Sequence, residues 1–360
     1  MRAFLPAARH HLKIVIARTP SNMWLMNKLK HRQCAWLKLL FPAYIIAAMI
    51  SASASAGTWS FVVAGDGRTD PNSLFTSPDP TGINTRAFTN LLWAVDQIRP
   101  RPEFMLFTGD LINGADPRVH DSVAQQLEAW KGLVSKWTPN LMVLPVRGNH
   151  ETDGDTDGKA WLTAFRSDLD INGVAYFPGE EGFSYSYFPP QHSNAVVIAL
   201  DQYQPAHVHR VNLVALENAL KKAKARHVDH IFVFAHEMAF TCAGHPDGEN
   251  MAAFPKERDR FLELLESYGC EYFFAGHDHT YDWMVIRHSH WPTDYALNQI
   301  VAGTAGATFY PDLGYYGDHH GYVLERKEHQ QFTYGYLLVT VDDSAKTNRV
   351  SVTFKAIQLK

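Results

Sequence analysis

The stretch TGDLIN, residues 108–113, follows directly on the short apolar run FMLF at residues 104–107. An apolar run that ends in Gly-Asp is typical of a buried strand followed by a tight turn, and it places Asp110 just beyond the strand. Four further stretches repeat the pattern: AGDGR at 64–68, GNHE at 148–151, FAHE at 234–237 and GHDH at 276–279. In layered α/β folds the loops beyond the strands present polar side chains along one edge. The five stretches therefore predict a metal site built from Asp, Asn and His.

The rest of the chain alternates between helical and strand patterns. Apolar residues recur at helical spacing over residues 85–98, 119–137, 160–169, 211–224 and 261–268. Short apolar runs predict strands at 57–64, 104–107, 141–146, 231–234 and 272–275, and the alternating segment 183–188 pairs naturally with 195–200. From residue 282 onwards strands predominate. We expect an α/β (α+β) fold in which two mixed β-sheets pack face to face, with helices outside and the loops gathered along one edge.

The first 56 residues differ in composition from the remainder. A basic segment at 26–38, an apolar run at 39–50 and small residues at 51–56 are typical of an export signal. We therefore expect a signal peptide over 1–56, translated from Met26 and cleaved after Ala56, and a single domain over 57–360 that is periplasmic or secreted. The alternative is an uncleaved membrane anchor, although the apolar core is shorter than the about 20 residues of a span. After cleavage we expect no stable membrane span.

Charge and cysteine content restrict the partners of the exported chain. The sequence has 33 Lys and Arg against 37 Asp and Glu, and eight of the basic residues lie in the first 56, so the remainder carries a net charge of about −12. Such a chain lacks the basic surface that nucleic acids or anionic membranes require, and we expect a small substrate. Cys242 and Cys270 remain after export, either paired or as buried free thiols. The sequence indicates no oligomeric state.

The residue types of the five stretches suit hydrolysis of a phosphate ester. This reaction needs a nucleophile better than water and positive charge, and two metal ions about 3.5–4 Å apart supply both. Asp110 has two oxygens and is the natural bridging ligand. Asp66 and His279 would complete one ion, and Asn149, His236 and His277 the other. These nitrogen and oxygen donors suit manganese, iron or zinc. Each motif alone is more often a turn or a hydrogen-bonded histidine, so the prediction rests on all five occurring together.

The ordered motifs GD, GDL, GNHE, H and GHDH resemble the calcineurin-like metallophosphoesterases from about Ser60 to Gly306. This superfamily includes purple acid phosphatases, protein phosphatases and cyclic-nucleotide phosphodiesterases. The resemblance implies a four-layer αββα sandwich with a dinuclear site of divalent or trivalent ions. It also implies that His150 contacts the phosphate and protonates the leaving group. Finally, it implies that Glu151 or Asp278 orients a neighbouring histidine.

The chain departs from the family pattern at Arg68, where many members have a metal-binding histidine. A guanidinium stays protonated and cannot bind a metal, so a mononuclear site is the alternative to the dinuclear one. In purple acid phosphatases a tyrosine three residues after the bridging Asp is a ligand. Here that residue is Asn113, whose carbonyl is a weak ligand, and no purple colour is expected. Arg68 either clamps a phosphate oxygen or pairs with Asp70 or another carboxylate.

We expect an exported phosphoesterase that acts by in-line attack of a metal-bound hydroxide. The loop histidines His245, His319 and His320 either shape the substrate pocket or are solvated loop residues. The absence of a basic groove for a polymer slightly favours monoesters over diesters. The alternative is a non-catalytic metal- or phosphate-binding protein in which Arg68 marks the loss of catalysis. His150 argues against it, because a binder needs no acid at that position.

Overall fold

The computed structural model describes residues 57–69, 79–205, 207–245, 248–347 and 349–360, which belong to the unit Ala56–Lys360. The expected signal peptide and Asp70 lie outside the described residues. Within those residues the structure has no helix with the length and apolar character that crossing a bilayer requires.

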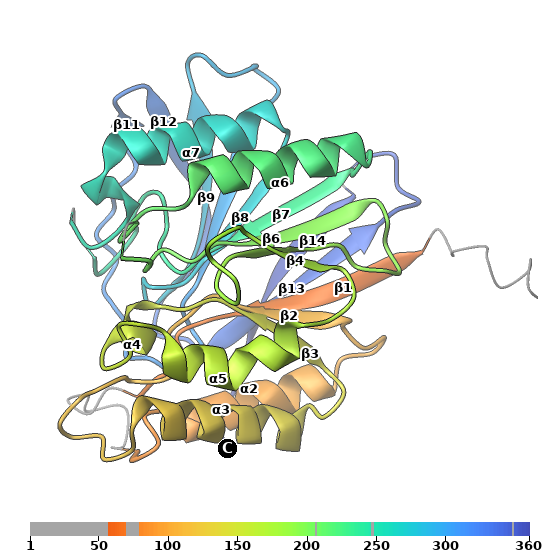
Figure 1. The fold of residues 1–360 in the computed structure, drawn as a ribbon. Coiled ribbons are helices and arrows are strands. Elements are labelled where there is room, and N and C mark those ends of the chain that lie inside the picture. Colours follow the sequence, from red (N-terminus) through yellow and green to blue (C-terminus); the bar gives the residue numbers. More distant parts are fainter. Residues whose placement is uncertain (1–56, 70–78, 206, 246–247, 348) are drawn as a thin grey trace, which may run out of the picture. The chain divides into compact units, whose positions relative to one another are not determined.

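The smaller of two mixed β-sheets has five strands in the order β14-β13-β1-β2-β3. Its strands are β1 (Thr58–Ala64), β2 (Phe104–Phe107), β3 (Met142–Pro145), β13 (Gly335–Asp342) and β14 (Val350–Ala356). The first three are parallel, and β13 and β14 join them antiparallel. The outer face is covered by α2 (Thr85–Asp96), α3 (Val123–Trp137) and α5 (Lys159–Leu169), as Figure 1 shows.

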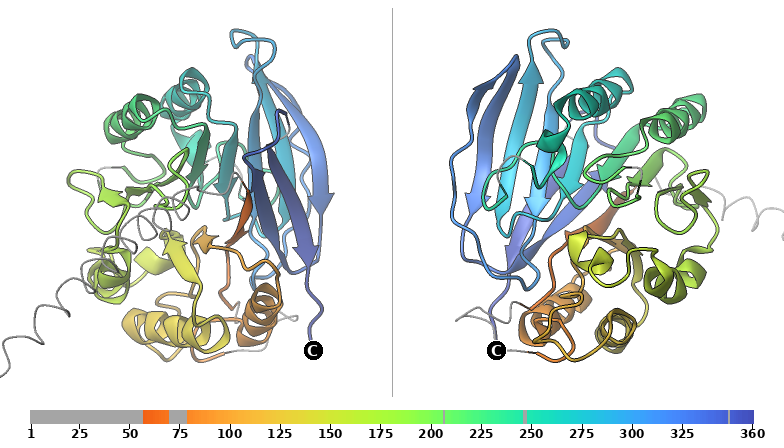
Figure 2. Two further views of the ribbon diagram at one scale, coloured as in Figure 1. Left: turned by 90° about the vertical axis from the view of Figure 1, so that its right-hand side faces the viewer. Right: turned by 60° about the vertical axis from the view of Figure 1, so that its left-hand side comes forward.

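The larger sheet has nine strands in the order β11-β12-β9-β10-β8-β7-β6-β5-β4. Its strands are β4 (Val174–Tyr176), β5 (Tyr185–Tyr187), β6 (Ala195–Ala199), β7 (His230–Phe234), β8 (Tyr272–Ala275), β9 (Tyr281–His288), β10 (Leu297–Ala302), β11 (Gly317–His319) and β12 (Tyr322–Gln330). Strands β6, β7, β8 and β10 form a parallel central block. Helices α6 (Leu213–Ala225) and α7 (Pro255–Ser267) cover the outer face, and the short helix η1 (Met251–Ala253) precedes α7 (Figure 2).

Aromatic side chains fill the space between the two sheets. The ring of Phe61 from the smaller sheet lies 5.1 Å from that of Phe104 and 4.9 Å from that of Phe232 in the larger sheet. A second buried cluster joins the larger sheet to α6 and α7. Burial of this apolar area at about 25 cal/mol per Å² is the main force that holds sheets and helices together. The arrangement confirms the expected fold of two mixed sheets flanked by helices.

Two helices begin at residues other than those that the apolar periodicity predicted, because residues at their N-termini determine where they start. Helix α3 begins at Val123 rather than at Val119, because Ser122 and Gln125 form a capping box. Helix α7 begins at Pro255, well before the predicted Phe261, because proline at the first helical position is preorganised for a helix. The predicted pairing of 183–188 with 195–200 is confirmed by β5 and β6, which are antiparallel neighbours.

Candidate metal centre

Three of the predicted ligands lie in sharp turns just beyond strands. Asp66, Asp110 and His277 have φ angles of 60°, 51° and 69°. Non-glycine residues rarely adopt this left-handed conformation, which costs on the order of 1–3 kcal/mol each. The turns bring the loops together, since the backbone N–H of His277 lies 3.1 Å from each carboxylate oxygen of Asp66. The strain is therefore located where the motifs meet.

Two glycines allow the carboxylates to approach neighbouring loops. A Cβ atom on Gly148 would lie 2.1 Å from Oδ1 of Asp110, and one on Gly276 would lie 2.4 Å from Oδ2 of Asp66. No side chain fits at such distances without moving the carboxylate. The glycines of GNHE and GHDH are thus required by the close packing around the two aspartates.

One donor set gathers around Nε2 of His236. Oδ1 of Asn149 and Nδ1 of His277 each lie 3.1 Å from this nitrogen, and Oδ1 of Asp110 lies 3.4 Å from it. Four strand ends supply these groups, because Asp110 follows β2, Asn149 begins the short helix α4 (Asn149–Thr152) after β3, and the histidines follow β7 and β8. Four donors of mixed nitrogen and oxygen type therefore face one point.

A second donor set shares Asp110. One ligand atom each from Asp66, Asp110 and His279 lies within 4.8 Å of the others, and all three residues are buried. Nε2 of His279 is 3.5 Å from Oδ1 of Asp66. Asp110 therefore offers its two oxygens to two neighbouring donor sets.

The histidines of both sets have fixed tautomers. Each ring donates its outer N–H to a backbone carbonyl: His236 Nδ1 to Thr108 at 2.7 Å, His279 Nδ1 to Thr308 at 2.6 Å, and His277 Nε2 to Glu249 at 2.7 Å. Burial lowers the pKa of His277 and of His279 well below the ordinary value. The inner nitrogens of His277 and His279 are therefore unprotonated, and their lone pairs face the neighbouring donors. A cation satisfies such an arrangement, so the residues fit a metal.

The two carboxylates titrate in opposite directions. Burial alone would raise the pKa of Asp110, but His236, His150 and Arg68 hold it below its usual range. Burial and the charge of Asp110 raise the pKa of Asp66 well above its usual value. Two buried carboxylates this close repel each other, and positive charge between them relieves the repulsion.

His150 lies beside Asp110 but outside both donor sets. Its backbone N–H donates to Oδ1 of Asp110 at 3.2 Å, and its ring Nδ1 donates to the carbonyl of Asn113 at 2.9 Å. Nε2 is left facing the centre, 3.8 Å from Oδ2 of Asp110. Burial lowers the pKa of His150, although the charge of Asp110 opposes the shift. Nε2 is therefore the ring nitrogen that His150 presents towards Asp110.

Arg68 points into the centre and pairs with the shared carboxylate. Its Nε lies 3.3 Å from Oδ2 of Asp110, and its Nη1 donates to the carbonyl of Thr69 at 3.4 Å. A β-bridge to Ile83 holds the Arg68 backbone. Its charge also lowers the pKa of Asp66, where burial dominates in the opposite sense. Among the described residues, the carboxylate that pairs with Arg68 is therefore that of Asp110.

Glu151 has a different environment from the one the resemblance implied. Its buried carboxylate accepts backbone N–H groups rather than a ring nitrogen: those of Gly148 at 2.6 Å, Leu111 at 2.8 Å, Asp110 at 2.9 Å and Ile112 at 3.1 Å. Burial and the charge of Asp110 raise its pKa to about 8. Glu151 therefore orders the backbone of two motifs.

Asn113 acts on His150 through its backbone. Its carbonyl accepts from the His150 ring, while its side chain hydrogen-bonds to Asp116. The structure thus turns the Asn113 side chain towards Asp116 rather than presenting it as the weak ligand that the sequence suggested.

Asp278 orients a histidine, as the resemblance implied. Its Oδ1 accepts from Nδ1 of His245 at 3.2 Å, and the His245 ring stacks on His277 with centroids 3.6 Å apart. The two remaining loop histidines lie at β11 and its turn, where the ring of His319 is 6.0 Å from that of Phe240. Within the described residues, neither His319 nor His320 joins the group around Asp110.

Three features of the site were not predicted from the sequence. Tyr310 stacks on His279 with centroids 4.1 Å apart. Glu237 pairs with His209, and Arg147 pairs with Asp201. Glu237 was detectable in principle, because it stands in the FAHE motif beside a predicted ligand.

The two cysteines, Cys242 and Cys270, are buried free thiols rather than a disulfide pair.

The Arg147–Asp201 ion pair fixes the GNHE loop. Two bonds of 3.2 and 2.6 Å join the side chains, which are almost completely buried. We expect Asp201→Asn to lower the free energy of unfolding by about 3–5 kcal/mol, because a buried guanidinium loses its counter-charge. Urea unfolding measures the effect.

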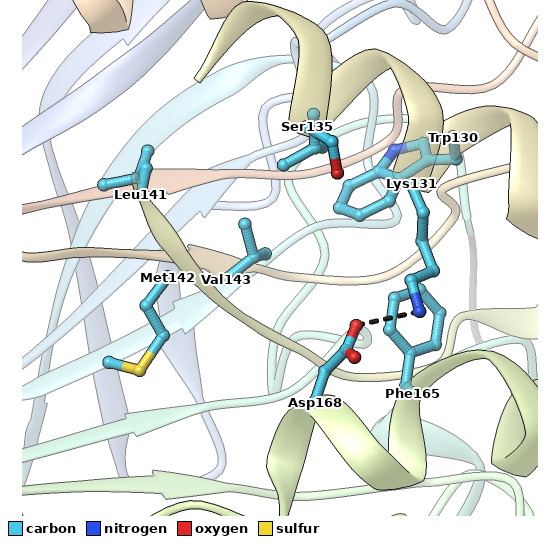
Figure 3. Close-up of a pocket in the computed structure, with 9 residues that line it drawn as sticks. Trp130, Lys131, Ser135, Leu141, Met142, Val143, Phe165 and Asp168 are labelled. Atoms are coloured by element: carbon cyan, nitrogen blue, oxygen red, sulfur yellow. Dashed lines mark ion pairs between the residues drawn. The ribbon is translucent and has the colours of Figure 1, made fainter. Parts of the chain in front are cut away.

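A matched control lies at the cavity of about 210 Å³ between α3, β3 and α5, where Lys131 and Asp168 pair at 2.9 Å near the surface (Figure 3). Asp168→Asn should cost less than about 1 kcal/mol, because exposed pairs contribute little. Equal losses in both variants would show that Asp201 has no special role.

Comparisons with known proteins agree with this geometry. The sequence model of the family described as calcineurin-like phosphoesterase matches residues 81–281. A search of curated protein sequences found no match.

Two solved structures share the fold. A purple acid phosphatase from yellow lupin (Lupinus luteus) seeds superposes with a TM-score of 0.59 and 12% identity, over 85% of this chain and 53% of that one. This chain therefore spans about half the length of the lupin enzyme. A PhoD structure has a TM-score of 0.51 and 10% identity, over 84% and 72% of the two chains. At such identities the likeness extends to the fold alone.

Proposed function

This chain belongs to the calcineurin-like phosphoesterase family, and from that premise we propose that it is an exported, metal-dependent hydrolase of phosphate esters. The observation that carries the proposal is the position of Asp110, whose two oxygens face two donor sets of histidine nitrogens and carboxylate or amide oxygens. Within the class we favour monoesters over diesters, and the expected signal at 1–56 supports export to the periplasm or beyond.

Manganese, iron or zinc suits the donors. Asp110, Asn149, His236 and His277 would hold the first ion, whereas Asp66, Asp110 and His279 offer only three protein donors to a second. When bound, such ions supply an acidified water and positive charge on the phosphoryl oxygens. Because Arg68 stands where a fourth donor is expected and adds a like charge, we propose that the second ion binds more weakly than the first.

His150 is proposed as the acid that protonates the leaving group. The carbonyl of Asn113 accepts from Nδ1, so the transferable proton is carried on Nε2, which faces the centre. Protonation as the ester bond breaks avoids expulsion of an unstable alkoxide, and such general acids contribute about 10² to 10⁴-fold.

Arg68 is proposed to hold a phosphate oxygen. Its Nε pairs with Asp110 and its Nη1 donates weakly to the carbonyl of Thr69, so the guanidinium extends positive charge beyond the carboxylate. Removal of a hydrogen bond to a charged group costs about 1.5–3 kcal/mol. Arg68→Ala should therefore lower kcat/KM by about 10- to 100-fold while changing stability much less.

The matched control is Arg260→Ala, which removes a guanidinium from an exposed pair with Glu263. Arg68→His adds a nitrogen donor and should raise the metal content counted by native mass spectrometry. An unchanged kcat/KM in Arg68→Ala would contradict the clamp role.

The first experiment is hydrolysis of a chromogenic phosphate monoester and its matching diester by the purified full-length protein. Metal is removed with a chelator, and manganese, zinc or iron is then added back. Turnover that depends on metal establishes the class, and the preferred ester decides between monoester and diester. No turnover in a folded, metal-loaded protein would favour the second candidate, a non-catalytic metal- or phosphate-binding protein. Arg68 in a ligand position is the observation that supports that candidate.

A further inference from the structure

A histidine and a glutamate form a second polar assembly beside the metal centre. Glu237 directly follows the ligand His236, and its side chain is fully buried. Its Oε1 accepts from Nδ1 of His209 at 2.8 Å. The buried amide of Gln202 fixes the glutamate, because it accepts from the Glu237 N–H at 2.7 Å and donates to its carbonyl at 3.2 Å. Gln202 therefore fixes the backbone of Glu237, and Oε1 of the buried carboxylate orients the imidazole of His209.

His209 offers its other ring nitrogen outward. Its backbone N–H donates to the carbonyl of Gln202 at 2.9 Å, and its φ of 61° places it in the left-handed region. The side chain is 27% exposed. Within the described residues, Nε2 of His209 has no hydrogen-bond partner. The loop therefore holds the His209 ring in one orientation and leaves its Nε2 available to a ligand.

The assembly lies on the same face of the fold as the metal ligands. The Tyr203 ring contacts both sides, with centroids 6.1 Å from His236 and 6.5 Å from His209. The carbonyl of Glu249 accepts a hydrogen bond from His277. The hydrogen bond to Glu237 raises the pKa of His209, and the negative charges of Glu237 and Glu249 add to this shift. His209 is therefore outside both donor sets but separated from the ligand His236 by a single side chain, that of Tyr203.

We propose that His209 binds the alcohol part of the substrate, and that this part is polyhydroxylated, as in a sugar phosphate. A hydroxyl group can accept from or donate to Nε2 and can also donate to the nearby carboxylate of Glu249. A further anionic group would be repelled by Glu237 and Glu249. An apolar alcohol would make no hydrogen bond to the ring, so a hydroxyl-bearing alcohol part is favoured over an apolar one. This inference rests on the proposed function of the same site.

Binding of two phosphonates tests the inference without turnover, because a carbon–phosphorus bond is not hydrolysed. The probes are the methylenephosphonate analogue of ribose 5-phosphate and benzylphosphonate, titrated calorimetrically into the metal-loaded full-length protein. The polyol probe should bind the wild type more tightly. His209→Ala should weaken the polyol probe by about 10-fold or more and benzylphosphonate by less than about 3-fold.

The matched control is His207→Ala, which removes an imidazole from the same loop and should leave both affinities unchanged. Glu249→Gln provides a second test that leaves the loop of His209 intact, and it should weaken the polyol probe selectively. Equal losses for both probes, or equal binding of both by the wild type, would overturn the inference and leave the proposed hydrolase intact. A wild type that binds neither phosphonate would overturn the proposed function itself.

Discussion

Replacement of Asp110 by asparagine should lower kcat/KM by about 10³-fold or more and should leave less than one tightly bound metal ion per chain. Asp110 is the only residue that contributes to both described donor sets, and the amide would carry no charge and only one ligand oxygen. The loss of several kcal/mol of charge stabilisation accounts for the size of the effect. Steady-state kinetics and native mass spectrometry on the same sample measure both quantities.

Asp168→Asn is the matched control for this change, because it makes the same substitution at an exposed pair remote from the centre. It should retain wild-type metal content and activity. Full activity in Asp110→Asn, with one ion still bound, would show that the carboxylate does not bridge and that the donor set around His236 works alone.

His150→Ala should lower kcat by about 10² to 10⁴-fold on phenyl phosphate while leaving the metal content unchanged. The effect should be smaller on nitrophenyl phosphate, because nitrophenolate leaves without being protonated. This difference between two esters distinguishes loss of an acid from general damage to the site. His290→Ala, which removes an exposed histidine from the β9–β10 turn, is the control.

The pH profile gives an independent test of the same residue. An acid must be protonated to act, so kcat should fall as pH rises through the pKa of His150. Burial lowers that pKa below the ordinary value of about 6.5, which places the fall on the acidic side of neutrality. His150→Ala should remove this limb. A mutant that keeps both the limb and its dependence on the leaving group would assign the acid to another residue.

The positions of the motifs could be predicted because they depend on local patterns. Short apolar runs that end in Gly-Asp or in a polar residue define strand ends, and parallel strands bring their carboxyl ends to one edge. Helix starts were less accurate, because the cap at Ser122 outweighed the apolar periodicity before it. The family resemblance supplied the proposed role of His150, which no local pattern reveals.

The supporting contacts could not be predicted because they join residues that are distant in sequence. Glu151 binds the backbone of residues about 40 positions earlier, and Arg147 pairs with Asp201, 54 positions later. A buried carboxylate accepts whichever donors the tertiary structure brings to it, and sequence spacing carries no record of that choice. The same holds for His209, whose loop has no regular pattern and whose partner lies 28 positions away.

The ligands divide evenly between the two sheets. Asp66, Asp110 and Asn149 follow strands of the five-stranded sheet, whereas His236, His277 and His279 follow strands of the nine-stranded sheet. An ion held by donors from both groups would therefore act as a cross-link between the sheets, and it would raise the free energy of unfolding by RT ln(1 + [L]/Kd), where [L] is the free metal concentration. If metal binds as proposed, the resistance of the fold to unfolding depends on the metal concentration of its surroundings as well as on the apolar core between the sheets.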